Sequence, residues 1–164
     1  TMVLGDAIAV ALMKMREFTL ADYARLHPGG QLGKRLILKV ADIMLKGEEN
    51  PLVRVSDGVK NCILKISEKR AGAVSIIDDN GKIVGVVTDY DIRKHLEKEE
   101  NIFSLEITAI MNNSPVYVYE DENAFSALKT MQEREKPITV LPVLNREKIV
   151  VGMLRLQDLV REGL

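Results

Sequence analysis

The chain has 164 residues, of which 46% are hydrophobic and 29% charged, the usual balance of a folded globular protein. Its 23 lysines and arginines are matched by 24 aspartates and glutamates, so a net charge of −1 gives no general attraction to nucleic acid or to an anionic membrane. No uncharged apolar run approaches the roughly 20 residues of a membrane span.

Cysteine and histidine usage excludes two further kinds of site. The single cysteine, Cys62, rules out an intramolecular disulfide, which fits a reducing cytoplasm, and it falls in a predicted helix where we expect a packed thiol. The two histidines, His27 and His95, lack the clustered partners that a metal site needs. We therefore expect a cytoplasmic protein with no metal, no nucleic-acid partner and no membrane partner.

Residues 1–16 are predicted to form a helix. Apolar residues follow the i, i+3 and i+4 spacing of one helix face, but Ala9, Val10 and Met13 are apolar as well, so the middle is apolar nearly all round. Such a helix is typical of a core or an interface. The stretch before the repeats described below is too short to cover it. We therefore expect the chain to be part of a longer protein with a further domain upstream.

Residues 19–26 are predicted to form a second short helix. Thr19 and Asp22 have a spacing like that of a capping box, and His27-Pro28-Gly29-Gly30 is a strong helix stop. From the residues alone, we interpret this segment as a helix and a loop that lead into a linker.

An internal repeat organises the rest of the chain. Ala41–Met44 matches Thr108–Met111, and Gly85–Ile92 matches Gly152–Leu159, both at a separation of 67 (111 minus 44 and 152 minus 85). Each copy is predicted to contain a strand, a helix, two strands joined by a hairpin, and a final helix. The expected ranges are 52–55, 59–69, 73–77 and 82–87 with a helix from 89 in the first copy, and 116–119, 123–133, 139–144 and 149–154 with a helix from 157 in the second.

This order of elements predicts an α/β (α+β) fold made of two pseudo-symmetric β-α-β-β-α units. Each copy has too few strands to be stable alone. We therefore expect the two units to pack sheet against sheet into one globule.

The motif that ends each sheet carries a resemblance to a known family. Gly85-Val86-Val87-Thr88-Asp89-Tyr90-Asp91-Ile92 resembles the Gly-h-x-Thr-x-x-Asp signature of a CBS domain, where h is hydrophobic. The resemblance implies one CBS domain at residues 40–100 and a second at 106–164. It also implies a small-molecule regulatory ligand.

The N-terminal residues resemble a different domain. Leu4–Leu12 and Ala24–Leu36, which includes the His-Pro-Gly-Gly motif, resemble the end of a sugar-isomerase (SIS) domain, specifically that of D-arabinose 5-phosphate isomerases. The resemblance implies that residues 1–36 are a helical SIS remnant of a homotetrameric enzyme. That enzyme interconverts ribulose and arabinose 5-phosphates for Kdo and lipopolysaccharide or capsule synthesis.

The same resemblance implies a catalytic role for His27 in the parent enzyme. The other catalytic groups and the phosphosugar loop of that family lie upstream of Thr1. Aldose–ketose isomerisation needs both a base and an acid, and one histidine cannot supply both. We expect this chain alone to be inactive and to need no cofactor.

Two ligand clefts are expected from the repeat. In the first copy the resemblance implies that Thr88 and Asp91 face phosphate and ribose, and the same spacing also fits a capping box that needs no ligand. In the second copy Arg155 replaces the hydroxyl while Asp158 remains; Arg155 can pair with a phosphate, or with Asp158 and so close the site. The expected walls are Pro51 and Leu52 with Gly72 and Ala73 in the first copy, and Pro115 and Val116 with Ile138 and Thr139 in the second.

Three functions are compared on this basis. The first is a regulatory module that binds AMP, ATP or a pathway product such as CMP-Kdo and biases the upstream SIS domain. The second is a ligand-free scaffold whose exposed helices pair two CBS pairs into a symmetric dimer within a tetrameric parent. The third, a nucleic-acid-binding regulator, is disfavoured by the balanced charge.

Overall fold

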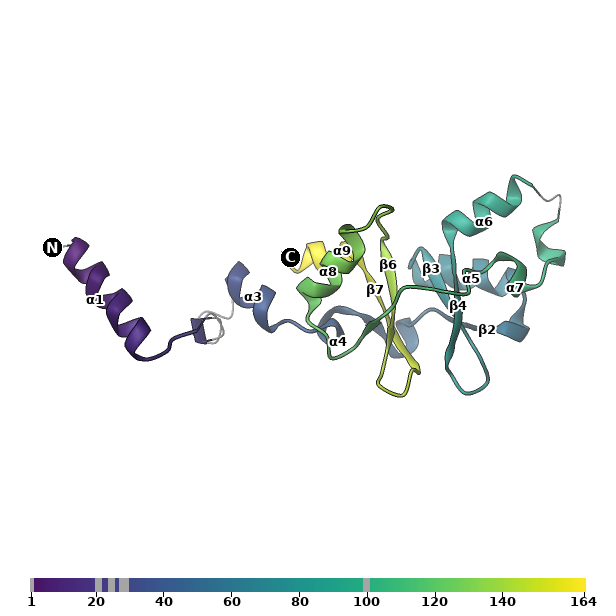
Figure 1. Ribbon diagram of the computed structural model, residues 1–164. Helices are drawn as coiled ribbons and strands as arrows, with labels where there is room; N and C mark the ends of the chain where they lie inside the picture. Colours follow the sequence, from purple (N-terminus) through teal and green to yellow (C-terminus); the bar gives the residue numbers. More distant parts are fainter. Residues whose placement is uncertain (1, 20–21, 24–25, 27–29, 99–100) are drawn as a thin grey trace.

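The computed structural model describes residues 2–19, 22–23, 26, 30–98 and 101–164. Two halves lie side by side, and each has the order of elements that the repeat predicts (Figure 1). The first half contains β2 (Leu52–Arg54), α5 (Val59–Lys69), β3 (Ala73–Ile77), β4 (Ile83–Thr88) and α6 (Asp89–Leu96). The second contains β5 (Val118–Tyr119), α8 (Ala124–Gln132), β6 (Val140–Leu144), β7 (Val150–Arg155) and α9 (Leu156–Arg161). The predicted α/β fold class is confirmed.

Each half forms its own mixed sheet. In the first, β2 runs parallel to β3, which is antiparallel to β4. The second repeats this pattern, with β5 parallel to β6 and β6 antiparallel to β7. A helix covers each sheet because its apolar residues share one face; on α5 these are Val59, Cys62 and Ile66, all buried. The short connecting helices are η1 (Gly47–Glu49), η2 (Val55–Asp57) and η3 (Ile102–Ser104).

The halves exchange their preceding segments, which the repeat did not predict. The segment α4 (Val40–Ile43) and β1 (Leu45–Lys46) comes before the first half, yet β1 pairs with β7, with Leu45 opposite Met153. Conversely, α7 (Ile107–Ile110) precedes the second half, and Asn112 after it bridges to Val86 of β4. Both pairings obey the 67-residue offset (112 minus 45 and 153 minus 86). A pseudo-twofold axis therefore relates the halves.

The cores follow the same exchange. Val40 and Met44 are buried in the core of the second half, whereas Ile102, Ile107 and Ile110 are buried in the core of the first. Between the two sheets lies a third apolar cluster that includes Ala73, Val86, Val140 and Met153. The expected sheet-to-sheet packing is thus confirmed, and burial of apolar surface at this seam joins the halves.

Among the described residues before this globule are the helices α1 (Met2–Met15) and α3 (Gln31–Ile37). In Figure 1, α1 (Met2–Met15) lies apart from both halves, and none of its residues is buried, although Met2, Val3 and Leu4 are all apolar. By contrast, α3 (Gln31–Ile37) is tied to the second half, since Lys34 Nζ donates to the carbonyl of Glu162 at 2.8 Å. The predicted helix over 19–26 lies partly outside the described residues; its capping exchange is present, with Asp22 N donating to Thr19 Oγ1 at 3.2 Å.

Candidate ligand-binding clefts

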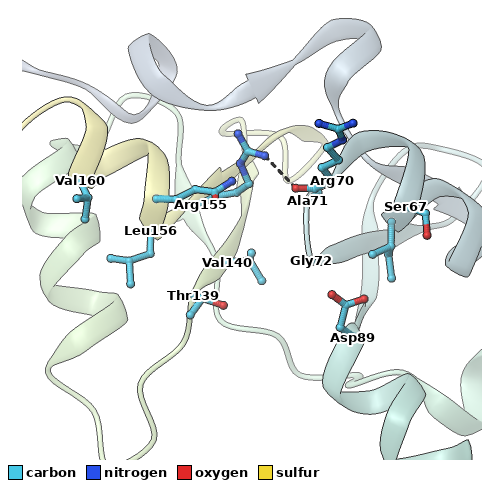
Figure 2. A pocket seen from close by; sticks show the side chains of 12 residues that line it. Ser67, Arg70, Ala71, Gly72, Asp89, Thr139, Val140, Arg155, Leu156 and Val160 are labelled. Atoms are coloured by element: carbon cyan, nitrogen blue, oxygen red, sulfur yellow. Dashed lines mark hydrogen bonds between the residues drawn. The ribbon is translucent and has the colours of Figure 1, made fainter.

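Two cavities open between the halves. One, of about 710 Å³, has Thr88 in its wall and is called here the Thr88 cleft. The other, of about 720 Å³, has Arg155 in its wall and is called the Arg155 cleft (Figure 2). Thr88 and Arg155 occupy equivalent positions, each at the end of a strand and before a helix. The two clefts are therefore counterparts in the pseudo-symmetric fold.

Each cleft takes its walls from both halves, so the expected grouping of wall residues is wrong. Pro115, Val116 and Ile138, expected beside Arg155, line the Thr88 cleft instead. Face-to-face packing around the pseudo-twofold axis explains this, because it sets the strand starts of one half against the strand end of the other. Gly72 and Thr139 lie at the seam and line both clefts.

Three other expected wall residues line neither cleft. Pro51 is buried, and its carbonyl accepts a hydrogen bond from Ser75 N at 2.9 Å, which extends the pairing of β2 with β3. Leu52 continues that strand. Ala73 is fully buried in the apolar cluster between the sheets. Pro51 and Leu52 therefore belong to the first sheet, and Ala73 belongs to the apolar cluster between the sheets.

Thr88 and Asp91 form the capping box of α6. Thr88 Oγ1 donates to Asp91 Oδ2 at 2.6 Å, Thr88 N donates to the same oxygen at 2.9 Å, and Asp91 N donates to Thr88 Oγ1 at 3.2 Å. The capping interpretation is confirmed. Thr88 also lines its cleft, whereas Asp91 is half-buried behind it. Asp91 Oδ1 takes no hydrogen bond from any described residue, which leaves one acceptor free.

The Thr88 cleft combines an apolar wall with two cations and one carboxylate, that of Asp89. Most of its apolar residues belong to the second half, and three of them are prolines. The apolar residues include Val86, Pro115, Val116, Pro137, Ile138 and Pro142. Arg93 of α6 and Lys136 of the loop after α8 bring positive charge, and neither forms an ion pair with a described residue. Such a cleft suits a ligand with a flat apolar part and an anionic part.

The Arg155 cleft is arranged differently. Arg155 Nε donates to Asp158 Oδ2 at 2.6 Å and Nη2 donates to Oδ1 at 2.8 Å, so the two side chains form a bidentate ion pair. Its third nitrogen, Nη1, donates to the carbonyl of Arg70 at 3.0 Å (Figure 2). Of the two arrangements that the sequence left open for Arg155, the structure has the ion pair with Asp158.

Sequence reasoning missed several lining residues, among them Asn112, Arg93 and Lys136. The repeat gave a signal for Asn112, because Asn112 follows Ile110-Met111 just as Leu45 follows Ile43-Met44. Lys136 carried no local signal, because only packing of the second half brings its loop to the end of β4. His27 lies outside the described residues.

Two kinds of feature are absent from the part of the chain that the structure describes. It holds no group of three or more His, Cys, Asp or Glu side chains placed to bind a metal ion. Nor does any helix in it have the length and apolar character needed to cross a membrane.

Comparison with known proteins places these features in context. The CBS domain family matches residues 40–98 and 107–164. Arabinose 5-phosphate isomerase KdsD of Francisella tularensis is 38% identical over 161 residues, which cover 98% of this chain and 48% of that protein. The protein of the same name from Escherichia coli K12 is 39% identical over 163 residues, 99% of this chain and 49% of its own length. The chain thus spans about half the length of these curated relatives.

Solved structures resemble the two halves together. CBSX2 of Arabidopsis thaliana in complex with AMP is 26% identical, with a TM-score of 0.62, over 76% of this chain and 95% of that one. The CBS domain pair of protein MJ0100, in complex with 5′-methylthioadenosine and S-adenosyl-L-methionine, is 25% identical with a TM-score of 0.67, over 76% of this chain and 94% of that one.

Proposed function

Because the chain belongs to the CBS-domain family and carries two copies of the domain, we propose that it is a regulatory module whose Thr88 cleft binds a nucleotide or a nucleotide sugar. The carrying observation is the composition of that cleft, an apolar wall facing two cations that have no ion-pair partner among the described residues. A nucleotide has the matching parts, a flat base and an anionic phosphate.

The proposal assigns a contact to each part of the ligand. The base lies against Val116 and Ile138, and the phosphate is held by Arg93 and Lys136 as charge-assisted hydrogen bonds. The carboxylate of Asp89, which lines the cleft, is the acceptor for a ribose hydroxyl. The AMP and adenosyl ligands named for two similar structures support a nucleoside, and CMP-Kdo is a further candidate.

Thermal-shift measurements with AMP, ATP, CMP and CMP-Kdo test this proposal. A ligand at 100 times its Kd stabilises the folded state by about 2.7 kcal/mol, so the melting temperature must rise. Lys136→Ala should weaken the shift, because it removes one of the two cations. Lys60→Ala is the matched control, since Lys60 is exposed on α5 and lines neither cleft. No shift with any of the four at millimolar concentration counts against the proposal.

We also propose that residues 1–36 are the end of a SIS domain, followed by CBS domains at 40–100 and 106–164, in a cytoplasmic, tetrameric arabinose 5-phosphate isomerase. The name of the relatives, arabinose 5-phosphate isomerase, supports the isomerase part of this proposal. So does α1, whose exposed apolar residues suit burial against an upstream domain. This chain alone should convert no ribulose 5-phosphate, whereas a chain that also carries such a domain should; conversion by this chain would contradict the assignment.

The exposed apolar side chains of α1 favour the scaffold function as a second candidate. Apolar residues cover α1 along its length, and Ile8 and Leu12 are among the exposed ones. A scaffold would bury such a helix in a symmetric contact. Sedimentation that shows a concentration-independent monomer would exclude this candidate.

A further inference from the structure

The two clefts have nearly equal volumes, about 720 and 710 Å³, so size does not distinguish them. Their chemistry differs at the residue before the final helix of each half, which is Thr88 in one cleft and Arg155 in the other. Whether each cleft can bind an anionic ligand depends on how Thr88 or Arg155 interacts with the carboxylate three positions later, which is Asp91 or Asp158.

In the Arg155 cleft the carboxylate is fully engaged. Arg155 Nε and Nη2 each donate to a different oxygen of Asp158, at 2.6 and 2.8 Å. In the Thr88 cleft only Asp91 Oδ2 is engaged, by Thr88 at 2.6 and 2.9 Å. Both oxygens of Asp158 are thus occupied by the guanidinium, whereas Asp91 is held through one oxygen and has no cationic partner.

Arg155 is also held from the opposite half. Its Nη1 donates at 3.0 Å to the carbonyl of Arg70, a residue at the end of α5 with a left-handed backbone (φ 49°). Figure 2 shows this bond running from Arg155 to the backbone beside Arg70 and Ala71. The side chains of Arg155 and Asp158 are only 14% and 10% exposed. The guanidinium is thus fixed at three nitrogens and shielded from water.

An anionic ligand gains little from this arginine. To pair with a phosphate, Arg155 must leave Asp158, which would remain a buried carboxylate without its partner, and breaking a buried pair is costly. In the Thr88 cleft Arg93 and Lys136 are exposed and have no ion-pair partner among the described residues, so a phosphate displaces nothing there.

We propose that Arg155 is a specificity-determining residue that closes its cleft to nucleotides, so that the chain binds one nucleotide, in the Thr88 cleft. This inference rests on the proposed function, which places the nucleotide in the Thr88 cleft, and adds that the Arg155 cleft takes none. Arg155 also joins the two halves through its hydrogen bond to the carbonyl of Arg70.

Isothermal titration with AMP measures the number of sites directly. The wild-type chain should bind one AMP per chain. Arg155→Thr restores the hydroxyl of the other copy and frees Asp158, so it should bind two. Arg134→Thr is the matched control, because it replaces an exposed arginine of the second half that lines neither cleft; this variant should still bind one.

Folding of each variant is checked by circular dichroism and a thermal melt. Thr88→Arg gives a second measurement that does not depend on the stability of R155T: the new side chain should pair with Asp91 and reduce the number of sites to zero. Two sites in the wild-type chain, or a folded R155T with no more sites than wild type, would overturn the inference. A wild-type chain with no site while R155T gains one would contradict the proposed function and support closure by Arg155.

Discussion

At the scale of single residues, Cys62 shows how burial controls chemistry. Burial raises the pKa of its thiol from 9.0 to about 11, with a further contribution from the carboxylate of Asp57. Because the folded state disfavours the thiolate, the contribution of the neutral thiol to stability is complete below pH 9 and is lost as the pH rises to about 11. A shift of this size corresponds to roughly 3 kcal/mol.

The stabilities of the wild type and of Cys62→Ala measure this contribution. We expect the difference in free energy of unfolding between them to be constant from pH 7 to 9 and to shrink by roughly 3 kcal/mol towards pH 11. Comparison with Cys62→Ala cancels the titration of lysines and tyrosines. A native thiol that reacts with a disulfide reagent at pH 8 as fast as in the unfolded chain would contradict the burial of Cys62.

Residue patterns predicted part of the candidate site. The Thr88 and Asp91 capping box is local, three residues apart, and so could be predicted from spacing alone. The state of Arg155 could not, because one of its partners is the carbonyl of Arg70, 85 residues away. Which rotamer an arginine adopts at a seam depends on packing that no local pattern encodes.

At the scale of elements, Asn123 joins the linker to the second half. Its Oδ1 accepts from Ser126 N at 3.1 Å and so caps α8, while its Nδ2 donates to the carbonyl of Arg35 at 2.9 Å. Asn123→Asp keeps the acceptor and loses the donor, whereas Asn123→Ala loses both. We expect N123D to release the end of α3 and keep α8 capped, and N123A to cost a further amount of about 1 kcal/mol.

Hydrogen exchange separates the two effects. In N123D the amides of residues 34–38 should exchange faster while those of α8 stay protected; in N123A both segments should exchange faster. Equal protection of residues 34–38 in wild type and N123D would show that the amide does not hold the linker.

The predicted element boundaries match the structure where the residues that start and stop a helix agree with the apolar spacing. The predicted helix at 59–69 matches α5 residue for residue, because Gly58 precedes it and Arg70 adopts the left-handed backbone after it. The strand predicted at 116–119 shrinks to Val118–Tyr119. Val116 instead lines the Thr88 cleft. The alternating pattern of residues 116–119 suits a strand as well as it suits a cleft wall. The sequence alone therefore does not show whether Val116 belongs to a strand or lines the cleft.

At the scale of the whole molecule, the exchange of segments leads us to expect that the two halves unfold as one unit. A repeat shows which segments are alike but not which copy they join, because that choice depends on pairing across the seam. Two glycines lie where the exchanged segments pack closely against the strands. A Cβ on Gly152 would lie 2.7 Å from the carbonyl of Leu45, and one on Gly85 would lie 2.8 Å from the carbonyl of Asn112.

Gly85→Ala and Gly152→Ala should therefore each destabilise the entire chain. The backbone carbonyls opposite them belong to paired segments and cannot move aside, so each change should lower the free energy of unfolding by about 1–3 kcal/mol, as overpacking does. Denaturant melts should remain single transitions, and hydrogen exchange should show lost protection in both halves. Gly5→Ala is the control: no atom lies within 4 Å of its added Cβ, and α1 has no buried residue, so the midpoint should not change. Lost protection confined to the second half in G152A would show instead that the halves unfold independently.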